Sequence, residues 1–359
     1  MNTDMSRHAT AGSSPEKALD RFREGGVIPA HPLALDSSLR LDETRQKALT
    51  RYYLAAGASG IAVGVHTTQF AIHDPEVGLL RPVLELAAET ASESRSDVVQ
   101  IAGICGPTQQ AVREAELAKT LGYHIGLLSP SPDLDDDAEL ERARAVGEVI
   151  PVMGFYLQPA VGGRALSRDF WIRLVSQPSL VGIKVAPFDR YRTLDVLYAV
   201  CEAGRNGDVA LYTGNDDHIL VDLATRHRLR IGADTYEVEF VGGLLGQWAM
   251  WTRPAVELLG EARRARTGDE RALRKLMSLA GELTDANAAI FDAANAFRGC
   301  IPGINEILTR VGLMEGRWCL DPNEDLSPGQ LMEIDRIWAS YPHLRDDEFI
   351  ADHLNDWLR

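Results

Sequence analysis

The sequence lacks most of the features that mark secreted, membrane or disulfide-stabilised proteins. Its 359 residues include only four cysteines, which are far apart and form no Cys-x-x-Cys pair. This spacing argues against a disulfide framework and against a zinc ribbon, and it favours a reducing compartment. No apolar run approaches the length of a membrane span, and residues 1–20 lack the apolar stretch of a signal peptide. We therefore expect a cytoplasmic protein that begins with a flexible tail over residues 1–24.

Positive charge is also scarce. The formal net charge is −15 at pH 7, which argues against nucleic acid and anionic membranes as partners. It does not exclude an anionic small molecule, because an acidic surface can still enclose a basic site. With 45% hydrophobic and 25% charged residues, the composition is that of a soluble chain with a large core.

Short apolar runs alternate with longer segments of helical spacing from about residue 25 onward. Strands that alternate with helices pair in parallel through right-handed crossovers, and eight such units predict a (β/α)8 barrel. We place the barrel at 25–259 and a helical extension at 260–359. The eight predicted strands are Gly26–Ala30, Gly60–Val65, Val98–Ile104, His124–Ser129, Val149–Tyr156, Leu180–Ala186, Val209–Thr213 and Arg228–Asp234.

Lysine is rare in this chain, and one lysine stands where a buried strand is predicted. Lys184 follows Leu180-Val181-Gly182-Ile183, whereas the other four lysines lie in the tail or in charged helical segments. A buried ammonium costs several kcal/mol unless it is paired, neutralised or used. In barrel enzymes the reactive groups lie at the carboxyl ends of strands, so Lys184 is a candidate nucleophile for a carbonyl carbon. The alternative is a rim lysine paired with an acid such as Asp189.

Two further strand ends carry groups suited to carbonyl chemistry. Tyr156 ends the fifth predicted strand, where its phenol could shuttle protons, or it could be a core aromatic with its hydroxyl bonded at the rim. Thr67 and Thr68 follow the second strand, where adjacent hydroxyls and backbone N–H groups could hold a carboxylate. Threonine pairs also cap helices routinely.

Taken together, these motifs resemble the class I, pyruvate-dependent aldolases and lyases of the dihydrodipicolinate synthase and N-acetylneuraminate lyase superfamily. The similarity extends over about residues 25–340, and the Tyr-x-x-Pro and Gly-Ile-Lys spacing is its most specific part. In chain order, the matching motifs are His31-Pro32, Thr67-Thr68, Ile101-Ala102-Gly103, Tyr156 to Pro159, Gly182 to Lys184, Thr213 to Asp217, Ile301-Pro302 and Val311-Gly312-Leu313.

The resemblance implies a role for each matching residue. Lys184 would form an imine with a 2-oxo acid such as pyruvate, and Tyr156 would relay protons. Thr67 and Thr68 would hold the carboxylate and extend the relay, and the backbone of Ile231-Gly232 would approach the bound keto acid. The resemblance further implies an aldehyde as second substrate, no cofactor or metal, and a homo-oligomer, either a dimer or a tetramer.

Departures from the family pattern bear on the second substrate. The synthase branch has an arginine shortly after the fifth-strand tyrosine, and Val161 stands at that position here. Aspartate semialdehyde is therefore not the expected substrate, although Arg164 is close enough to bind an anion differently. His66, Phe70 and Phe155 would shape an acceptor pocket that could take a ring-bearing or apolar aldehyde.

Three other functions stay open on the sequence alone. The same imine could support dehydration or hydration instead of aldol cleavage. The chain could instead be a relative that binds a keto acid without turning it over, because a fold does not fix a function. A metal-dependent enzyme on the same barrel would draw ligands from His66, His73, Asp74, Asp216 or His218, whose spacing matches no recognised metal motif.

Overall fold

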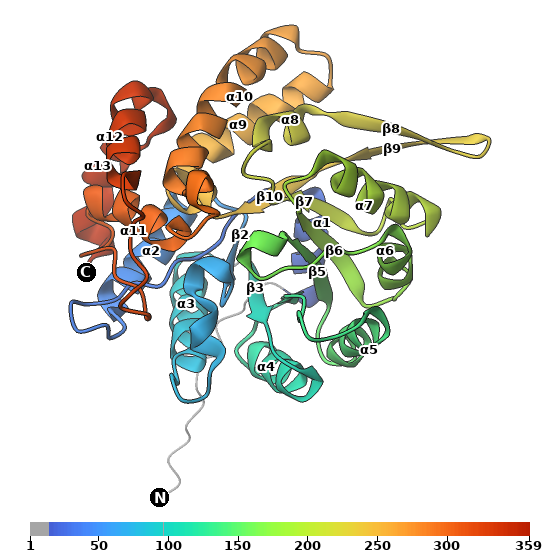
Figure 1. The fold of residues 1–359 in the computed structure, drawn as a ribbon, viewed down its shortest axis with the longest axis horizontal. Coiled ribbons are helices and arrows are strands. Elements are labelled where there is room, and N and C mark those ends of the chain that lie inside the picture. Colours follow the sequence, from blue (N-terminus) through green and yellow to red (C-terminus); the bar gives the residue numbers. More distant parts are fainter. Residues whose placement is uncertain (1–13, 96) are drawn as a thin grey trace, which may run out of the picture.

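The computed structural model, which describes residues 14–95 and 97–359, confirms the predicted (β/α)8 barrel with a helical extension (Figure 1). Eight parallel strands form one sheet in the order β1-β10-β7-β6-β5-β4-β3-β2, and a parallel bridge between Ala30 and Ala62 joins its two edges. The barrel strands are β1 (Val27–Pro29), β2 (Gly60–Val63), β3 (Val99–Ile104), β4 (Ile125–Leu128), β5 (Val152–Leu157), β6 (Leu180–Ala186), β7 (Ala210–Thr213) and β10 (Gly242–Leu245).

Seven of the eight predicted strands are confirmed, and the eighth prediction is wrong. The segment predicted as strand eight lies in an antiparallel hairpin of β8 (Arg226–Ile231) and β9 (Asp234–Glu239), which projects from the barrel (Figure 1). Its alternating arginines are exposed, which a barrel strand buried on both faces would not allow. The last barrel strand is β10, where a Cβ on Gly242 would lie 2.1 Å from the Gly26 carbonyl oxygen. Glycine therefore permits the close pairing of β10 with β1.

The predicted flexible tail is wrong for its last ten residues. Helix α1 (Pro15–Glu24) closes the amino-terminal end of the barrel, and its Phe22 is fully buried among the inward-facing strand residues. The Phe22 ring stacks on Tyr212 at 4.7 Å, and the Tyr212 hydroxyl donates a 2.6 Å hydrogen bond to the Phe22 carbonyl. The first 13 residues of the predicted tail lie outside the described residues.

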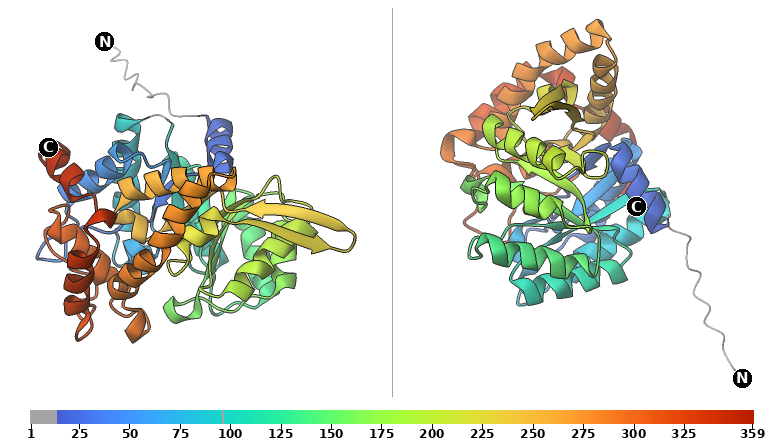
Figure 2. Two further views of the ribbon diagram at one scale, coloured as in Figure 1. Left: turned by 90° about the horizontal axis from the view of Figure 1, so that it is seen from above. Right: turned by 90° about the vertical axis from the view of Figure 1, so that its right-hand side faces the viewer.

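Helices surround the sheet and extend beyond it at one side (Figures 1 and 2). The predicted boundary after residue 259 falls inside α9. None of the described helices is long and apolar enough to cross a membrane. The remaining helices are α2 (Glu43–Ala55), α3 (Leu80–Ser94), α4 (Thr108–Thr120), α5 (Asp136–Gly147), α6 (Arg168–Val175), α7 (Arg190–Glu202), α8 (Ile219–Ala224), α9 (Thr252–Arg266), α10 (Glu270–Ile290), α11 (Cys300–Arg310), α12 (Gln330–Ser340) and α13 (Asp347–Trp357).

Candidate active site

A small cavity, partly open to solvent, lies at the carboxyl ends of the barrel strands. The strand ends and their loops form its floor, and the segment from Phe291 to Ile304 of the helical extension contributes to its wall. Most of the lining is apolar and aromatic, with a few polar groups among it. Its lining residues are Ala30, His66, Thr67, Phe155, Leu157, Gln158, Val161, Lys184, Ala186, Phe188, Gly214, Asp216, Gly246, Phe291, Phe297, Cys300 and Ile304.

Lys184 lies on the inner face of β6 and reaches into this cavity. Its side chain is 7% exposed, and its Nζ lies 4.3 Å from the centre of the Phe155 ring. Within residues 14–95 and 97–359 it has no hydrogen-bond or ion-pair partner. Burial lowers its pKa from 10.5 to about 8, against the opposing effect of Asp216 and Cys300. About a tenth of this amine is therefore neutral, and hence nucleophilic, at pH 7, compared with about 1 in 3,000 for an ordinary lysine.

Gly214, at the end of β7, leaves the space that the Lys184 side chain occupies. A Cβ on residue 214 would lie 2.9 Å from Lys184 Cε and 2.8 Å from Ala186 Cβ. Both distances are shorter than folded proteins tolerate between carbon atoms. Glycine is needed here for close approach, and it fixes the path of the lysine toward the cavity.

The structure does not place Tyr156 beside Lys184, and the prediction for this residue is wrong. β5 pairs with β6 in a register that sets Phe155 opposite Lys184, so Phe155 points into the barrel and Tyr156 points outward. Tyr156 packs against Trp171 of α6 at 5.1 Å, and its hydroxyl donates to the Leu166 carbonyl at 3.2 Å. The hydroxyl also accepts hydrogen bonds from the Leu166 N–H and from Arg192. Tyr156 is therefore a core aromatic with a hydrogen-bonded hydroxyl, which is the alternative to a proton shuttle that the sequence left open.

Thr67 and Thr68 have different surroundings in the structure. Thr67 lines the cavity, and its hydroxyl donates to the Ala30 carbonyl at 2.8 Å. Thr68 is fully buried beneath it, where its hydroxyl donates to the His31 carbonyl and accepts from the N–H groups of Gly64 and Val65. These bonds use the Thr68 hydroxyl to hold the turn after β2. The catalytic role predicted for Thr68 does not agree with this placement.

Three residues predicted to bind substrate lie away from the cavity. Arg164 pairs with Asp136 at 2.7 Å and lies over the Phe170 ring. Ile231 and Gly232 are at the tip of the projecting hairpin of β8 and β9. The backbone position predicted for Ile231 and Gly232 is taken instead by Gly246, which follows β10 and lines the cavity.

His66 and Asp216 bring titratable groups to the same cavity as Lys184. Loss of contact with water, together with the charge of Lys184, lowers the pKa of His66 to about 4, so its imidazole is neutral. Burial raises the pKa of Asp216 to about 7, and Lys184 opposes this shift. The sequence places Asp216 in the Thr213 to Asp217 motif and offers it as a possible metal ligand, but it does not indicate a catalytic role. In the described part of the chain, no three His, Cys, Asp or Glu side chains are grouped to hold a metal ion.

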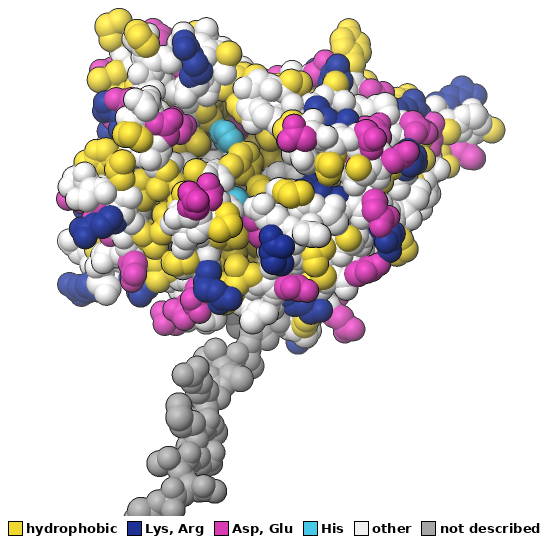
Figure 3. Space-filling view, turned by 60° about the horizontal axis from the view of Figure 1, so that its bottom comes forward, with side chains coloured by type: hydrophobic (Ala, Val, Ile, Leu, Met, Phe, Trp, Pro, Cys, Tyr) yellow, Lys and Arg dark blue, Asp and Glu magenta, His cyan; other side chains and the backbone are white. Residues whose placement is uncertain are grey.

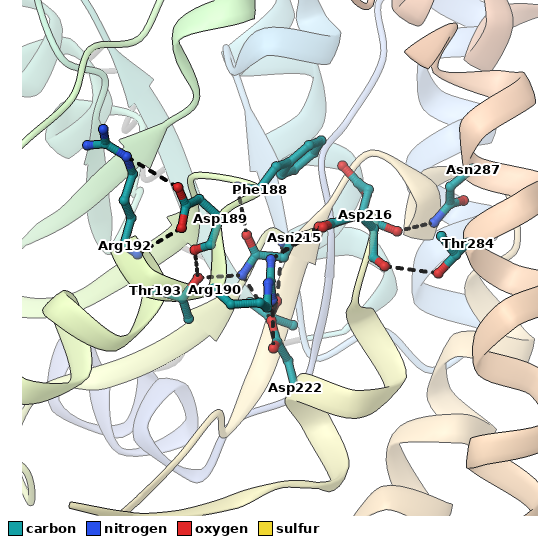
Figure 4. A network of polar contacts seen from close by, with 12 residues as sticks. Phe188, Asp189, Arg190, Arg192, Thr193, Asn215, Asp216, Asp222, Thr284 and Asn287 are labelled. Atoms are coloured by element: carbon teal, nitrogen blue, oxygen red, sulfur yellow. Dashed lines mark hydrogen bonds and ion pairs between the residues drawn. The ribbon is translucent and has the colours of Figure 1, made fainter. Parts of the chain in front are cut away.

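A buried polar network holds the loop after β7 that carries Asp216 (Figure 4). Asn215 accepts a hydrogen bond from the Phe188 N–H at 3.1 Å and donates to Asp222 at 2.9 Å. On the other side of the loop, the Asn287 side chain of α10 donates to the Asp216 carbonyl at 2.7 Å. Asp216 is therefore fixed from both the barrel side and the helical extension.

Two strained phenylalanines meet at the cavity. Phe188 and Phe297 have φ angles of 51° and 65°, in the left-handed region that side chains other than glycine seldom adopt. Their rings contact edge to face with centroids 5.5 Å apart. Such strain persists only where the surrounding structure enforces it, and it is common at ligand sites.

On the face drawn in Figure 3, Lys and Arg side chains alternate with Asp and Glu and do not gather into a basic patch. The same face shows a hollow in which histidine side chains lie among hydrophobic ones. Nothing on this face resembles the basic stripe of a nucleic-acid-binding protein.

Solved structures resemble this chain over most of its length, although no protein-family model and no curated protein sequence matches it. Dihydrodipicolinate synthase from Oceanobacillus iheyensis is similar with a TM-score of 0.70 and 18% identity, over 91% of this chain and 99% of that one. N-acetylneuraminate lyase from Fusobacterium nucleatum complexed with pyruvate gives 0.69 and 18%, over 88% and 96%. Dihydrodipicolinate synthase from Thermotoga maritima gives 0.72 and 17%, over 88% and 97%. At these identities the similarity shows the fold, and it is the fold of the two enzymes that the motifs resemble.

Proposed function

We propose that this protein is a Schiff-base-forming lyase that makes or cleaves a C–C bond next to a 2-oxo acid such as pyruvate. The observation that carries the proposal is Lys184, a buried lysine without a pairing partner among the described residues, whose lowered pKa favours the neutral amine and which faces a cavity at the carboxyl end of the barrel. The fold shared with a lyase structure complexed with pyruvate supports the same chemistry.

The chemistry follows from the position of the amine. The lone pair of Lys184 Nζ attacks the carbonyl carbon of the keto acid, the carbonyl oxygen takes up protons, and water leaves as the iminium forms. When the substrate is a 4-hydroxy-2-oxo acid, its C4 hydroxyl loses a proton and the electron pair of the C3–C4 bond moves into the iminium, so that an aldehyde departs and an enamine remains. Protonation of the enamine carbon and hydrolysis of the imine return pyruvate and the free lysine. The reverse sequence joins the enamine to an aldehyde.

Covalent trapping tests this proposal without knowledge of the aldehyde. The wild-type protein incubated with pyruvate and sodium borohydride is expected to gain the mass of one reduced pyruvate adduct, located on Lys184 by peptide mass spectrometry. Lys184→Ala is expected to gain none, and Lys119→Ala, which removes an exposed lysine, is expected to behave as wild type. Absence of an adduct with pyruvate and with larger 2-oxo acids would contradict the proposal.

The cavity lining supports an uncharged, apolar aldehyde as the partner substrate. No arginine of the described residues lines the cavity, and its far wall is formed by Phe188, Phe291 and Phe297. Aromatic side chains favour an apolar or ring-bearing group, whereas a second carboxylate would find no cation beyond the lysine already used. Product formation from pyruvate is expected to be faster with benzaldehyde than with glyoxylate at equal concentration. The opposite preference, measured by chromatography of the products, would contradict this assignment.

A further inference from the structure

The proposed chemistry needs a proton donor and acceptor beside the lysine, and the described residues place no tyrosine in the cavity. Phe155, which cannot transfer a proton, takes the inward position opposite Lys184. Four titratable side chains line the cavity: His66 from the turn after β2, Lys184 from β6, Asp216 from the loop after β7 and Cys300 from α11. The candidates for the proton-transfer group are therefore His66, Asp216 and Cys300.

Two of these three are poorly suited to the task. Burial raises the pKa of the Cys300 thiol far above neutrality, so it does not release its proton. The pKa of His66 is lowered to about 4, which makes it a weak base and leaves it without a proton to donate as an acid at pH 7. Asp216 is different, because one carboxyl oxygen, Oδ1, is shielded from solvent and has no hydrogen-bond partner among the described residues.

A buried carboxyl oxygen without a hydrogen-bond partner lowers the stability of the fold. Such a group in a native structure needs an explanation, and at a cavity a role in binding or catalysis supplies one. The main chain of Asp216 is fixed by Asn287, and the adjoining carbonyl of Asp217 accepts a hydrogen bond from Thr284 at 2.9 Å (Figure 4). The main chain around Asp216 is thus held in place, and the carboxyl group that lines the cavity keeps one oxygen without a hydrogen-bond partner among the described residues.

Resting on the proposed function, we infer that Asp216 is the catalytic acid and base of this site, in the place that the motif resemblance assigned to Tyr156. As an acid, it protonates the hydroxyl of the carbinolamine, whose C–O bond breaks to release water and leave the iminium. As a base, it takes a proton from the methyl carbon of the pyruvate imine; the C–H electron pair becomes the enamine C=C bond, and the C=N π pair moves onto the nitrogen. A pKa of about 7 suits both directions near neutral pH.

Exchange of the pyruvate methyl protons in D₂O, followed by proton NMR, isolates the base step and requires no aldehyde. Wild-type protein is expected to catalyse this exchange. Asp216→Asn is expected to slow it by a factor of 100 or more, in line with the 10²–10⁴-fold contribution of general acid–base catalysis. Asp208→Asn is the matched control, because Asp208 precedes β7, pairs with Arg205 at the surface and does not line the cavity. It is expected to exchange as wild type does.

The pH dependence of borohydride trapping gives a readout that a merely structural role would not move. The negative charge of Asp216 raises the pKa of Lys184, while burial lowers it. Cys300 also raises that pKa, the neutral imidazole of His66 adds no charge to the site, and neither group changes in the variant. Asp216→Asn is therefore expected to form the pyruvate adduct down to a lower pH than wild type does.

Three results would overturn the inference. If Asp216→Asn forms the adduct and exchanges methyl protons as fast as wild type does, then Asp216 is not the base. If Tyr156→Phe loses methyl-proton exchange and Asp216→Asn retains it, then Tyr156 is the base instead. If Asp216→Asn does not fold, Asp216→Ala is expected to regain exchange on addition of formate, and no gain would count against the inference. Absence of any adduct in wild-type protein contradicts the proposed function instead, so the two failures are distinguishable.

Discussion

Replacement of Lys184 by methionine is expected to abolish the pyruvate adduct and at the same time to stabilise the fold. The lysine is buried, and its ammonium group has no ion-pair or hydrogen-bond partner among the described residues. The drop in its pKa from 10.5 to about 8 corresponds to a cost of about 3 kcal/mol for the charged form. Methionine has a similar length and no charge, so we expect the free energy of unfolding at pH 7 to rise by about 1–3 kcal/mol. Loss of the contact with the Phe155 ring offsets part of the gain.

The pH dependence of this effect has a definite sign. Below pH 8 the lysine is protonated in both the folded and the unfolded state, and the full cost is present. Between about pH 8 and pH 10.5 the unfolded chain binds more protons than the folded one, so wild-type stability rises with pH through this window. Lys184→Met lacks this group, and its advantage over wild type is expected to shrink across the same window.

Urea unfolding followed by circular dichroism at pH 7 and pH 10 measures both effects. Lys119→Met serves as the control, because Lys119 is exposed near the end of α4 and its replacement should leave stability nearly unchanged. A Lys184→Met protein less stable than wild type at pH 7 would mean that the lysine is a structural element of the core. The outcome thus separates a lysine retained for chemistry from one retained for packing.

The position of Lys184 in a buried strand facing the cavity was predictable from the sequence, because a charge in an apolar run has few explanations. The tyrosine was not, since motif spacing does not specify which face of a strand a residue occupies. β5 carries an irregularity between Val152 and Met153, and the register beyond it sets Phe155 opposite Lys184. A shift of one residue exchanges the two faces of a strand, so Phe155 enters the barrel and Tyr156 leaves it.

The prediction of the eighth strand was wrong for a different reason. Arg226, Arg228 and Arg230 alternate with less polar residues, which is typical of a half-exposed antiparallel strand and argues against a barrel strand. The strand that closes the barrel, Gly242–Leu245, is a short run of two glycines and two leucines, without the β-branched residues or the alternation that would indicate a strand. Gly242 is needed for the close approach to the segment that leads into β1, a contact between the first and last strands of the barrel that no local pattern reveals. Local sequence likewise does not show that Asp216 lines the same cavity as Lys184, because this follows from the fold of the loop after β7 and its contact with α10.

Gly214→Ala is expected to reduce the rate of adduct formation by a factor of about 100 while the protein stays folded. The added methyl group would lie 2.9 Å from Lys184 Cε and 2.8 Å from Ala186 Cβ. Of these two neighbours, the flexible lysine is the one able to move, and its displacement shifts the amine away from the carbonyl carbon. Misplacement of a reacting group by about 1 Å can cost about 10²-fold in rate. The rate of borohydride-trapped adduct formation at saturating pyruvate measures the effect directly.

Gly207→Ala is the matched control for this substitution. Gly207 precedes β7, and a Cβ there would meet no atom within 4 Å, so its replacement is expected to leave the trapping rate unchanged. If Gly214→Ala reacts as fast as wild type, then the path of Lys184 past Gly214 is not the reactive one. A large loss of stability in Gly214→Ala would instead indicate that Ala186 and the β6 backbone yield before the lysine does. A slow but fully folded Gly214→Ala would show that the close approach of β7 to Lys184 sets the geometry of the nucleophile.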